Sequence, residues 1–332
     1  MKIITLLVFA VFCTGMMHGQ KGNPTPPVPV IFDTDIGPDY DDIGAIAVLH
    51  AMADRGECEI LATVASNKHK YIASVLDVMN TYFMRPGIPI GIVRGQAVNM
   101  EAWQKWDSII VSKYPHDISN NEQAEDALKL YRKILSRQPD HSVTIITVGF
   151  LTNMANLLQS GPDEFSSLTG QELISKKVKQ LVCMAAIFDS RMGTFKEFNL
   201  IKDSIASKIT YENWPTPILF SGFEIGSKIY TGLPIVQSNL RHSPVKDVFA
   251  RSLPMDPNDK NGRMSWDQTA VLVAVRGPEK YFDERKGKIV CNPDGSNGWE
   301  AIGTRDRYLV IKMPPDKLAH IINSLMMHQP NK

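Results

Sequence analysis

Short apolar runs alternate with amphipathic stretches along most of this chain, and that alternation limits the folds it can adopt. Runs with the length and composition of buried strands occur at residues 28–33, 59–66, 88–93, 142–149, 179–186 and 216–223. Apolar side chains recur at helical spacing between these runs, at residues 41–53, 70–83 and 124–138. This order predicts an α/β fold with a doubly wound, mainly parallel open sheet, helices on both faces, and ligands at the carboxyl ends of the strands.

The last part of the chain has a different pattern. Residues 287–313 predict strands, two of them joined by a turn at Pro293-Asp294-Gly295, and residues 314–328 predict a final helix opened by proline. We therefore expect one catalytic domain, residues 30–328, with a small β addition near its C-terminus.

The first 19 residues have the form of a secretory signal peptide. A single lysine, Lys2, precedes an apolar stretch at residues 3–17 that is too short and too weakly flanked to be a membrane span. Residues 20–29 are rich in proline and predict an extended tether. We expect an exported protein, periplasmic or secreted, with no later segment that is apolar over the length needed to span a bilayer.

The charge balance argues against a nucleic-acid partner. The chain has 36 Lys and Arg residues and 35 Asp and Glu residues, so removal of Lys2 with the signal peptide leaves 35 of each. A chain with no net charge and no block of basic residues lacks the electrostatic footprint of nucleic-acid binding.

A cluster of aspartates marks the candidate site. The segment "VIFDTDIGPDYDDIGAIAVLHA", residues 30–51, places five carboxylates between an apolar strand and an apolar helix, at Asp33, Asp35, Asp39, Asp41 and Asp42. Like charges at this density repel one another unless something offsets them. Helix capping explains one or two of them, and an EF-hand fails because the twelfth position from Asp33 is Gly44. A hard divalent cation such as calcium explains several at once.

Four further segments accompany the aspartates in one order along the chain: "ILATVASN", "ITVGFLTNMANLL", "KEFNLIKDSIASKI" and "SWDQTAVLVAV". Together the five segments, from about Val30 to beyond Val275, resemble the inosine/uridine-preferring nucleoside hydrolases, which are calcium-dependent nucleoside N-ribohydrolases. The resemblance implies that a nucleoside is the substrate, and that the protein assembles as a homodimer or homotetramer.

The resemblance also implies roles for individual residues. It implies that calcium is held by Asp35, Asp42, the backbone carbonyl of Val148, and Asp267. Asp35 would also be the general base for a water bound to the ion. The ribose hydroxyls would be held by Asp41, Asn67, Glu197 and Asn199. These residue types suit the reaction, because cleavage of an N-glycosidic bond develops positive charge on the sugar, which carboxylates stabilise.

Two departures from the family pattern concern specificity. The loop is two residues longer than the commonest form and carries the extra carboxylate Asp39, for which we expect a helix-capping role; the alternative is that Asp39 replaces Asp41 at the ribose. Trp266 stands where pyrimidine-tolerant members have histidine, which favours a purine base stacked on the indole. Trp103 or Trp106 would supply the other face of the base, unless both are partly buried loop aromatics.

Two altered segments, residues 183–186 and 189–193, leave room for other functions. They are compatible with a nucleoside- or sugar-binding protein that has little or no turnover, or with a hydrolase of a modified ribosyl substrate. A phosphatase of the haloacid-dehalogenase type, with magnesium, is a poorer match, because it gives no role to the Asp41–Asp42 pair or to Glu197.

Overall fold

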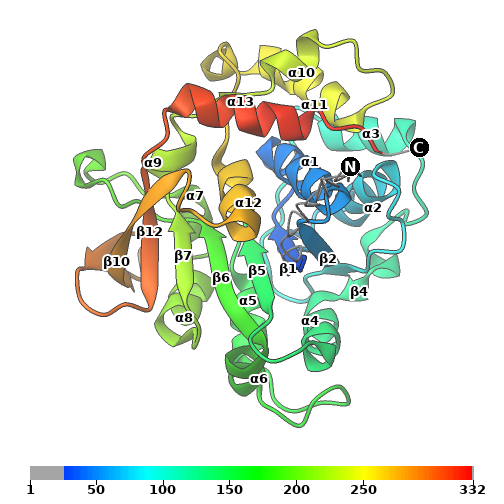
Figure 1. The fold of residues 1–332 in the computed structure, drawn as a ribbon. Helices are drawn as coiled ribbons and strands as arrows, with labels where there is room; N and C mark the ends of the chain where they lie inside the picture. The colour runs from blue at the N-terminus through cyan, green and yellow to red at the C-terminus, as the bar shows by residue number, and fades with distance from the viewer. Residues whose placement is uncertain (1–25, 331–332) are drawn as a thin grey trace, which may run out of the picture.

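The computed structural model describes residues 26–330, so the predicted signal peptide (1–19) and most of the predicted tether (20–29) lie outside the described residues. Ten strands form one sheet, in the order β11-β10-β12-β7-β6-β5-β1-β2-β3-β4 (Figure 1). These strands are β1 (Val28–Thr34), β2 (Cys58–Ala65), β3 (Ile90–Ile92), β4 (Glu125–Asp126), β5 (Val143–Thr147), β6 (Val178–Met184), β7 (Ile218–Ser221), β10 (Phe282–Cys291), β11 (Asn297–Glu300) and β12 (Asp306–Ile311).

Most neighbouring strands of this sheet are parallel. Every pair from β4 across to β12 is parallel, whereas β10 pairs antiparallel with both β12 and β11. The predicted β addition therefore extends the edge of the main sheet, and the turn at Pro293-Asp294-Gly295 joins β10 to β11. A separate two-stranded sheet pairs β8 (Tyr230–Thr231) with β9 (Arg263–Met264).

Helices cover both faces of the sheet. They are α1 (Asp41–Asp54), α2 (Ile72–Tyr82), α3 (Trp106–Lys113), α4 (Ala127–Arg137), α5 (Thr152–Gln159), α6 (Gly170–Lys177), α7 (Phe198–Lys202), α8 (Ser204–Asn213), α9 (Phe223–Gly226), α10 (Leu233–Gln237), α11 (Pro244–Ser252), α12 (Trp266–Arg276) and α13 (Pro315–Met326). Within the described residues, α1, α2, α12 and α13 pack on one face, and α4, α5, α6 and α8 pack on the other. The predicted α/β fold is confirmed.

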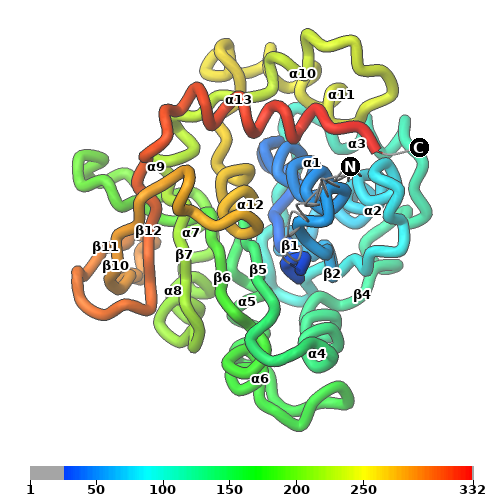
Figure 2. The backbone as a smooth tube through the Cα atoms, in the orientation of Figure 1, coloured from blue at the N-terminus to red at the C-terminus, as the bar shows by residue number. Residues whose placement is uncertain are grey.

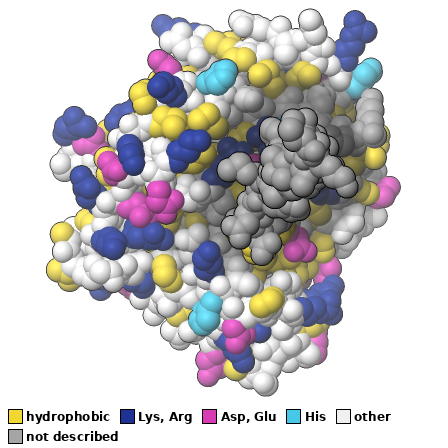
Figure 3. Space-filling view, viewed as in Figure 1, with side chains coloured by type: hydrophobic (Ala, Val, Ile, Leu, Met, Phe, Trp, Pro, Cys, Tyr) yellow, Lys and Arg dark blue, Asp and Glu magenta, His cyan; other side chains and the backbone are white. Residues whose placement is uncertain are grey.

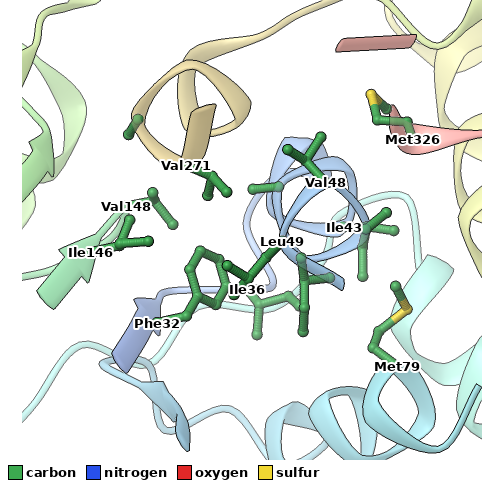
Figure 4. Packing of buried hydrophobic residues seen from close by; sticks show 14 of the residues in the cluster. Phe32, Ile36, Ile43, Val48, Leu49, Met79, Ile146, Val148, Val271 and Met326 are labelled. Carbon is green, nitrogen blue, oxygen red and sulfur yellow. The ribbon is translucent and has the colours of Figure 1, made fainter. Parts of the chain in front are cut away.

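The two faces divide the side chains of each buried strand. In β1, Val30 and Phe32 enter the core beneath α1 and α12, whereas Ile31 enters the core on the opposite face. This is the alternation that a strand buried on both faces requires, and it explains why the run is apolar throughout. Figure 4 shows the first of these cores around Phe32, Leu49 and Val271.

Helix α1 is enclosed on all sides. It packs against the sheet, α12 and α13, and all its residues from Asp41 to Met52 are buried. The C-terminal helix α13 crosses over α1, as the backbone trace shows (Figure 2). No helix within residues 26–330 is both long enough and apolar enough to cross a membrane. On the face shown in Figure 3, positive and negative side chains are interspersed.

The order of the strands creates a switch point between β1 and β5. From β1 the chain proceeds outward through β2, β3 and β4, and it then returns to the other side of β1 and proceeds through β5, β6 and β7. Loops that leave neighbouring parallel strands in opposite directions open a crevice at their carboxyl ends. Asp35 follows directly after β1, and Val148 follows directly after β5, so both lie at this crevice.

Candidate active site

A pocket of about 190 Å³ lies at the switch point. It is lined by Asp35, Asp39, Asp41, Val148, Met184, Glu197, Phe198, Asn199, Phe223, Arg263, Trp266 and Asp267. Seven of the nine predicted site residues therefore line this pocket. Of the other two, Asp42 is grouped with the lining residues Asp39 and Asp267, and Asn67 donates a hydrogen bond to the carbonyl of the lining residue Asp35.

Carboxylates from distant parts of the chain converge in this pocket. Asp42 lies in the first turn of α1 and Asp267 in the first turn of α12. One oxygen each of Asp39, Asp42 and Asp267 lie within 4.8 Å of one another, a spacing that a metal ion can bridge. Asp42 Oδ1 accepts a hydrogen bond from Thr34, but Asp42 Oδ2 is buried and has no partner among the described residues. A buried carboxylate oxygen facing other carboxylates is the donor set of a hard cation, so the residues fit a metal site.

Burial and mutual repulsion control the protonation of this cluster. Burial is the largest cause that raises the pKa of Asp35, Asp42 and Asp267 well above the usual carboxyl value, and the neighbouring aspartate charges add to it. The same causes raise the pKa of Asp41 to about 7 and that of Asp39 to about 6. Without a cation the cluster thus holds protons near neutral pH, and a bound cation would favour the ionised form.

Asp39 does not cap the helix, which corrects our expectation. The N-cap of α1 is Tyr40, and no side chain bonds to the free backbone N–H groups at this end. Asp39 Oδ2 instead lies 2.8 Å from Arg263 Nη2. One of its oxygens also falls within the group around Asp42 and Asp267, which makes Asp39 a further candidate ligand of the cation.

The residues near β5 and β6 that were predicted to bind ribose are positioned by hydrogen bonds with backbone groups. The Val148 carbonyl accepts a hydrogen bond from Asn199 Nδ2 at 3.2 Å, so these two predicted site residues are in direct contact. The Glu197 carboxylate caps α7 by accepting from the N–H groups of Asn199 (2.9 Å) and Leu200 (3.1 Å). Burial raises the pKa of Glu197 to about 7. The carboxylate is therefore fixed in direction at the pocket wall.

Asn67 does not line the pocket and instead forms hydrogen bonds with the backbone near Asp35. Its amide nitrogen donates to the carbonyls of Asp35 (2.9 Å) and Met100 (2.8 Å), and its oxygen accepts from the N–H groups of His69 (3.1 Å) and Met100 (3.0 Å). Two donors and two acceptors account for the whole capacity of an amide. In this structure Asn67 thus positions the Asp35 loop, which differs from the ribose contact expected from the sequence.

Three aromatic side chains, together called the aromatic wall, line the pocket: Phe198, Phe223 and Trp266. Trp266 Nε1 donates to the Phe223 carbonyl at 2.8 Å, and the two rings lie 5.2 Å apart. Trp103 is half exposed and Trp106 is fully buried, and neither is among the residues that line the pocket. The other aromatic residues that line the pocket are therefore Phe198 and Phe223, which the sequence did not single out, and Phe223 is the one that packs against Trp266.

Arg263 is the charged residue of the site that sequence reasoning missed. Its guanidinium lies inside the acidic cluster, at 2.8 Å from Asp39 and 3.1 Å from Asp41. The signal that points to it is the extra carboxylate Asp39, because a further negative charge beside Asp41 and Asp42 is stabilised by a nearby positive one.

Residues 30–312 match the protein family described as inosine-uridine preferring nucleoside hydrolase. The chain belongs to this family. Among the chain's curated relatives, the pyrimidine-specific ribonucleoside hydrolase RihA of Salmonella agona (strain SL483) is 28% identical over 217 residues, which are 60% of this chain and 62% of the relative. The chain thus spans about 62% of the length of the curated relatives that it matches.

Solved structures of nucleoside hydrolases share the fold. The plant nucleoside hydrolase PpNRh1 superposes with a TM-score of 0.70 at 18% identity, over 91% of this chain and 99% of that one. The purine-preferring ribonucleoside hydrolase of Gardnerella vaginalis superposes with a TM-score of 0.68 at 13% identity, over 90% and 99%. The family predicted from the five sequence segments and the α/β fold are both confirmed.

Proposed function

We propose that this protein is an exported, calcium-dependent ribonucleoside N-ribohydrolase that cleaves the N-glycosidic bond to give ribose and a free base, with purines favoured. The observation that carries the proposal is the convergence of Asp35, Asp39, Asp41, Asp42 and Asp267 at the switch point of a nucleoside hydrolase fold. Among the described residues, Asp42 Oδ2 is buried there without a hydrogen-bond partner. A binding protein needs no such concentration of buried negative charge.

In this proposal Asp35, Asp42, Asp267 and the Val148 carbonyl hold the ion, with Asp39 at the edge of the group. A bound calcium ion supplies positive charge that orients a water and lowers its pKa. Asp35 lines the pocket, where its carboxylate would take a proton from the attacking water. Asp41, Glu197 and Asn199 hold the ribose hydroxyls, and the negative charge of the Asp41 and Glu197 carboxylates stabilises the positive charge that develops on the sugar ring.

The base lies against the aromatic wall. Trp266, Phe198 and Phe223 offer apolar ring surface, and the residues that line the pocket include no histidine to protonate a leaving base. A purine gains more from stacking than a smaller pyrimidine does, which supports the proposed preference. Relatives that are 28% identical are named pyrimidine-specific, so the assay compares purine nucleosides with uridine.

The first experiment is release of reducing sugar from inosine, guanosine, adenosine and uridine, with and without a calcium chelator. We expect release from the purine nucleosides that stops on chelation and returns with added calcium. Release that persists in chelator would refute the role of the metal, and faster release from uridine would refute the purine preference. No release from any of the four would refute the proposed reaction.

Asp35→Ala distinguishes a hydrolase from a binding protein. We expect the variant to lose sugar release while the protein still binds ribose, because Asp41, Glu197 and Asn199 remain. Calorimetric titration with ribose measures the binding. If the wild-type protein binds nucleoside but releases no sugar, the result would favour a binding protein over a hydrolase.

We also propose that residues 1–19 are removed on export and that the mature protein is a homodimer or homotetramer. N-terminal sequencing of protein recovered from the periplasm or the medium tests the first point. Light scattering of the purified protein tests the second. A monomer, or a recovered chain that still begins at Met1, would contradict the respective proposal.

A further inference from the structure

We propose that Arg263 divides the acidic cluster into two parts, a part that binds calcium and a part that binds ribose, and that it thereby limits the affinity for calcium. The inference rests on the proposed function, because it assumes that calcium and ribose occupy this pocket. It assigns a positioning role to Arg263, to which the proposed function gives no contact with calcium or ribose.

The contacts of Arg263 identify which carboxylates it pairs with and so keeps from binding calcium. Nε and Nη2 both bond to Asp41 Oδ1, at 3.2 and 3.1 Å, and Nη2 also lies 2.8 Å from Asp39 Oδ2. Nη1 is 3.8 Å from Asp259, which also accepts a hydrogen bond from the Tyr40 hydroxyl at 2.5 Å. Because both bonds to Asp41 end on Oδ1, its other oxygen is not used by Arg263 and can accept a ribose hydroxyl.

The guanidinium is fixed in place by its surroundings. It lies 5.1 Å from the ring centroids of both Tyr40 and Trp266, a distance at which a cation is attracted to an aromatic face. The preceding Gly262 has a φ of +109°, and a Cβ there would lie 2.6 Å from the Thr231 carbonyl, so β9 approaches β8 closely at this point. Both constraints hold Arg263 in one orientation toward the 39–41 loop.

Arg263 acts on calcium through charge and through Asp39. A fixed positive charge beside Asp39 and Asp41 repels a second cation bound to Asp42 and Asp267. Asp39 is shared, because one of its oxygens bonds to Arg263 while the residue also belongs to the group with Asp42 and Asp267. Removing the guanidinium would free Asp39 as an additional calcium ligand.

Recognition of an anionic substrate group is a poorer explanation of the same guanidinium. Three carboxylates, those of Asp39, Asp41 and Asp259, already surround it. A phosphate or carboxylate of a substrate would have to approach an excess of negative charge, which is unfavourable. Arg263 therefore serves the protein's own carboxylates.

The test compares Arg263→Met with Arg263→Lys. Calcium binding to chelator-treated protein is measured by titration calorimetry, and the KM for inosine is measured at saturating calcium. For Arg263→Met we expect calcium to bind about tenfold more tightly, because a nearby positive charge is lost, and KM to rise because Asp41 loses its orientation. For Arg263→Lys we expect calcium affinity within about threefold of wild type, because the charge remains, and a raised KM, because one ammonium cannot replace the two bonds to Asp41 Oδ1.

A double variant tests the role of Asp39. Adding Asp39→Asn to Arg263→Met should remove most of the gain in calcium affinity, because the freed ligand is gone. The matched control is Arg276→Met, which removes a similar two-point pair with Glu57 at the opposite end of α12 and should change neither quantity. Circular dichroism verifies that each variant is folded.

The outcomes separate this inference from the proposed function. Unchanged or weaker calcium binding by Arg263→Met, in protein that is folded and whose wild type binds calcium and releases sugar, would overturn the inference and leave the proposed function standing. Failure of both wild type and Arg263→Met to bind calcium would overturn both. Calcium binding that appears only in Arg263→Met would support the inference and contradict the calcium dependence of the wild type.

Discussion

Asp33 and Asp42 show how two carboxylates of one motif differ in their surroundings. Both are fully buried, and each has one oxygen without a partner among the described residues. Asp33 Oδ2 accepts hydrogen bonds from the neutral groups of Tyr131 (2.8 Å) and Asn153 (3.0 Å), on the side of the sheet away from the pocket's cluster. Asp42 faces other carboxylates. Only the second arrangement calls for a cation.

The first prediction is that Asp42→Asn abolishes measurable calcium binding and lowers kcat/KM by about 100-fold or more, because a metal ligand in the centre of the cluster loses its charge. Titration calorimetry with calcium and the sugar-release assay measure the two effects. Asp33→Asn is the control, for which we expect calcium affinity close to that of wild type. Equal losses in both variants would mean that the whole motif, and not Asp42, supports the ion.

Ala186 has a backbone conformation that favours glycine. Its φ is +70°, its N–H lies 3.4 Å from the Glu197 carboxylate, and its carbonyl accepts from the N–H of Phe223. A non-glycine residue in the left-handed region is strained, so Ala186 carries strain at a point that holds Glu197.

The second prediction is that Ala186→Gly raises the free energy of unfolding. Relief of about 1–2 kcal/mol of strain exceeds the roughly 0.4–1 kcal/mol that glycine costs in chain entropy. Urea denaturation measures the difference. Ala185→Gly, at a buried neighbour for which no positive φ is found, should lower stability instead; a loss in both variants would contradict the strain.

At the scale of elements, the close approach of two loops decides where Asp35 lies. A Cβ on Gly149, just after β5, would lie 2.3 Å from the Asp35 backbone nitrogen and 2.6 Å from its Cβ. No side chain fits between the loop after β1 and the loop after β5. This explains the glycine in "ITVGFLTN" by packing, and it shows that the two strands at the switch point position the site together.

The third prediction is that Gly149→Ala destabilises the protein by about 1–3 kcal/mol through overpacking and lowers kcat/KM by about 10- to 100-fold by displacing Asp35. Chemical denaturation and the sugar-release assay measure these effects. Gly161→Ala is the control, because a Cβ at Gly161 meets nothing within 4 Å. An active, stable Gly149→Ala variant would show that the loops can separate without cost.

The elements were more predictable than their contacts. Period-two and helical spacing reflect burial of whole faces, so the strands at residues 28–34 and 143–147 and the helix at 41–54 agree with the sequence to within a few residues. Arg263 could not be placed this way, because its bond to Asp41 joins residues 222 positions apart. Asn67 was placed in the right loop, but its partners include the backbone of Met100, whose path no periodicity describes.

For the whole molecule, the buried carboxylates couple stability to pH. Burial raises the pKa of Asp33, Asp41 and Glu197 to about 7 in the folded protein, above the usual values that the unfolded chain retains. The folded state therefore binds protons more tightly than the unfolded state. The resulting stabilisation is complete below the unfolded pKa values and is lost as the pH rises through about 7.

The fourth prediction is that metal-free protein has a lower Tm at pH 8 than at pH 5, and that saturating calcium reduces this difference. Calcium binds the ionised carboxylates of the folded state alone, so its stabilisation grows as the pH rises. Thermal denaturation at several pH values, in chelator and in calcium, measures both slopes. A Tm in chelator that stays constant or rises over this range would contradict the raised pKa values.

The distance in sequence between Asp41 and Arg263 also has a consequence for how the protein is made. Their contact spans 222 residues, and Asp267 follows Arg263 by only four. A growing chain can pair β1 with β2 and β5 early, but it carries the aspartate loop without its guanidinium and without the late aspartate until most of the polypeptide has been synthesised. Any chain that ends before Arg263 presents concentrated negative charge and no catalytic pocket. The site can therefore be completed only late in synthesis, and a product truncated before Arg263 lacks two of its charged residues.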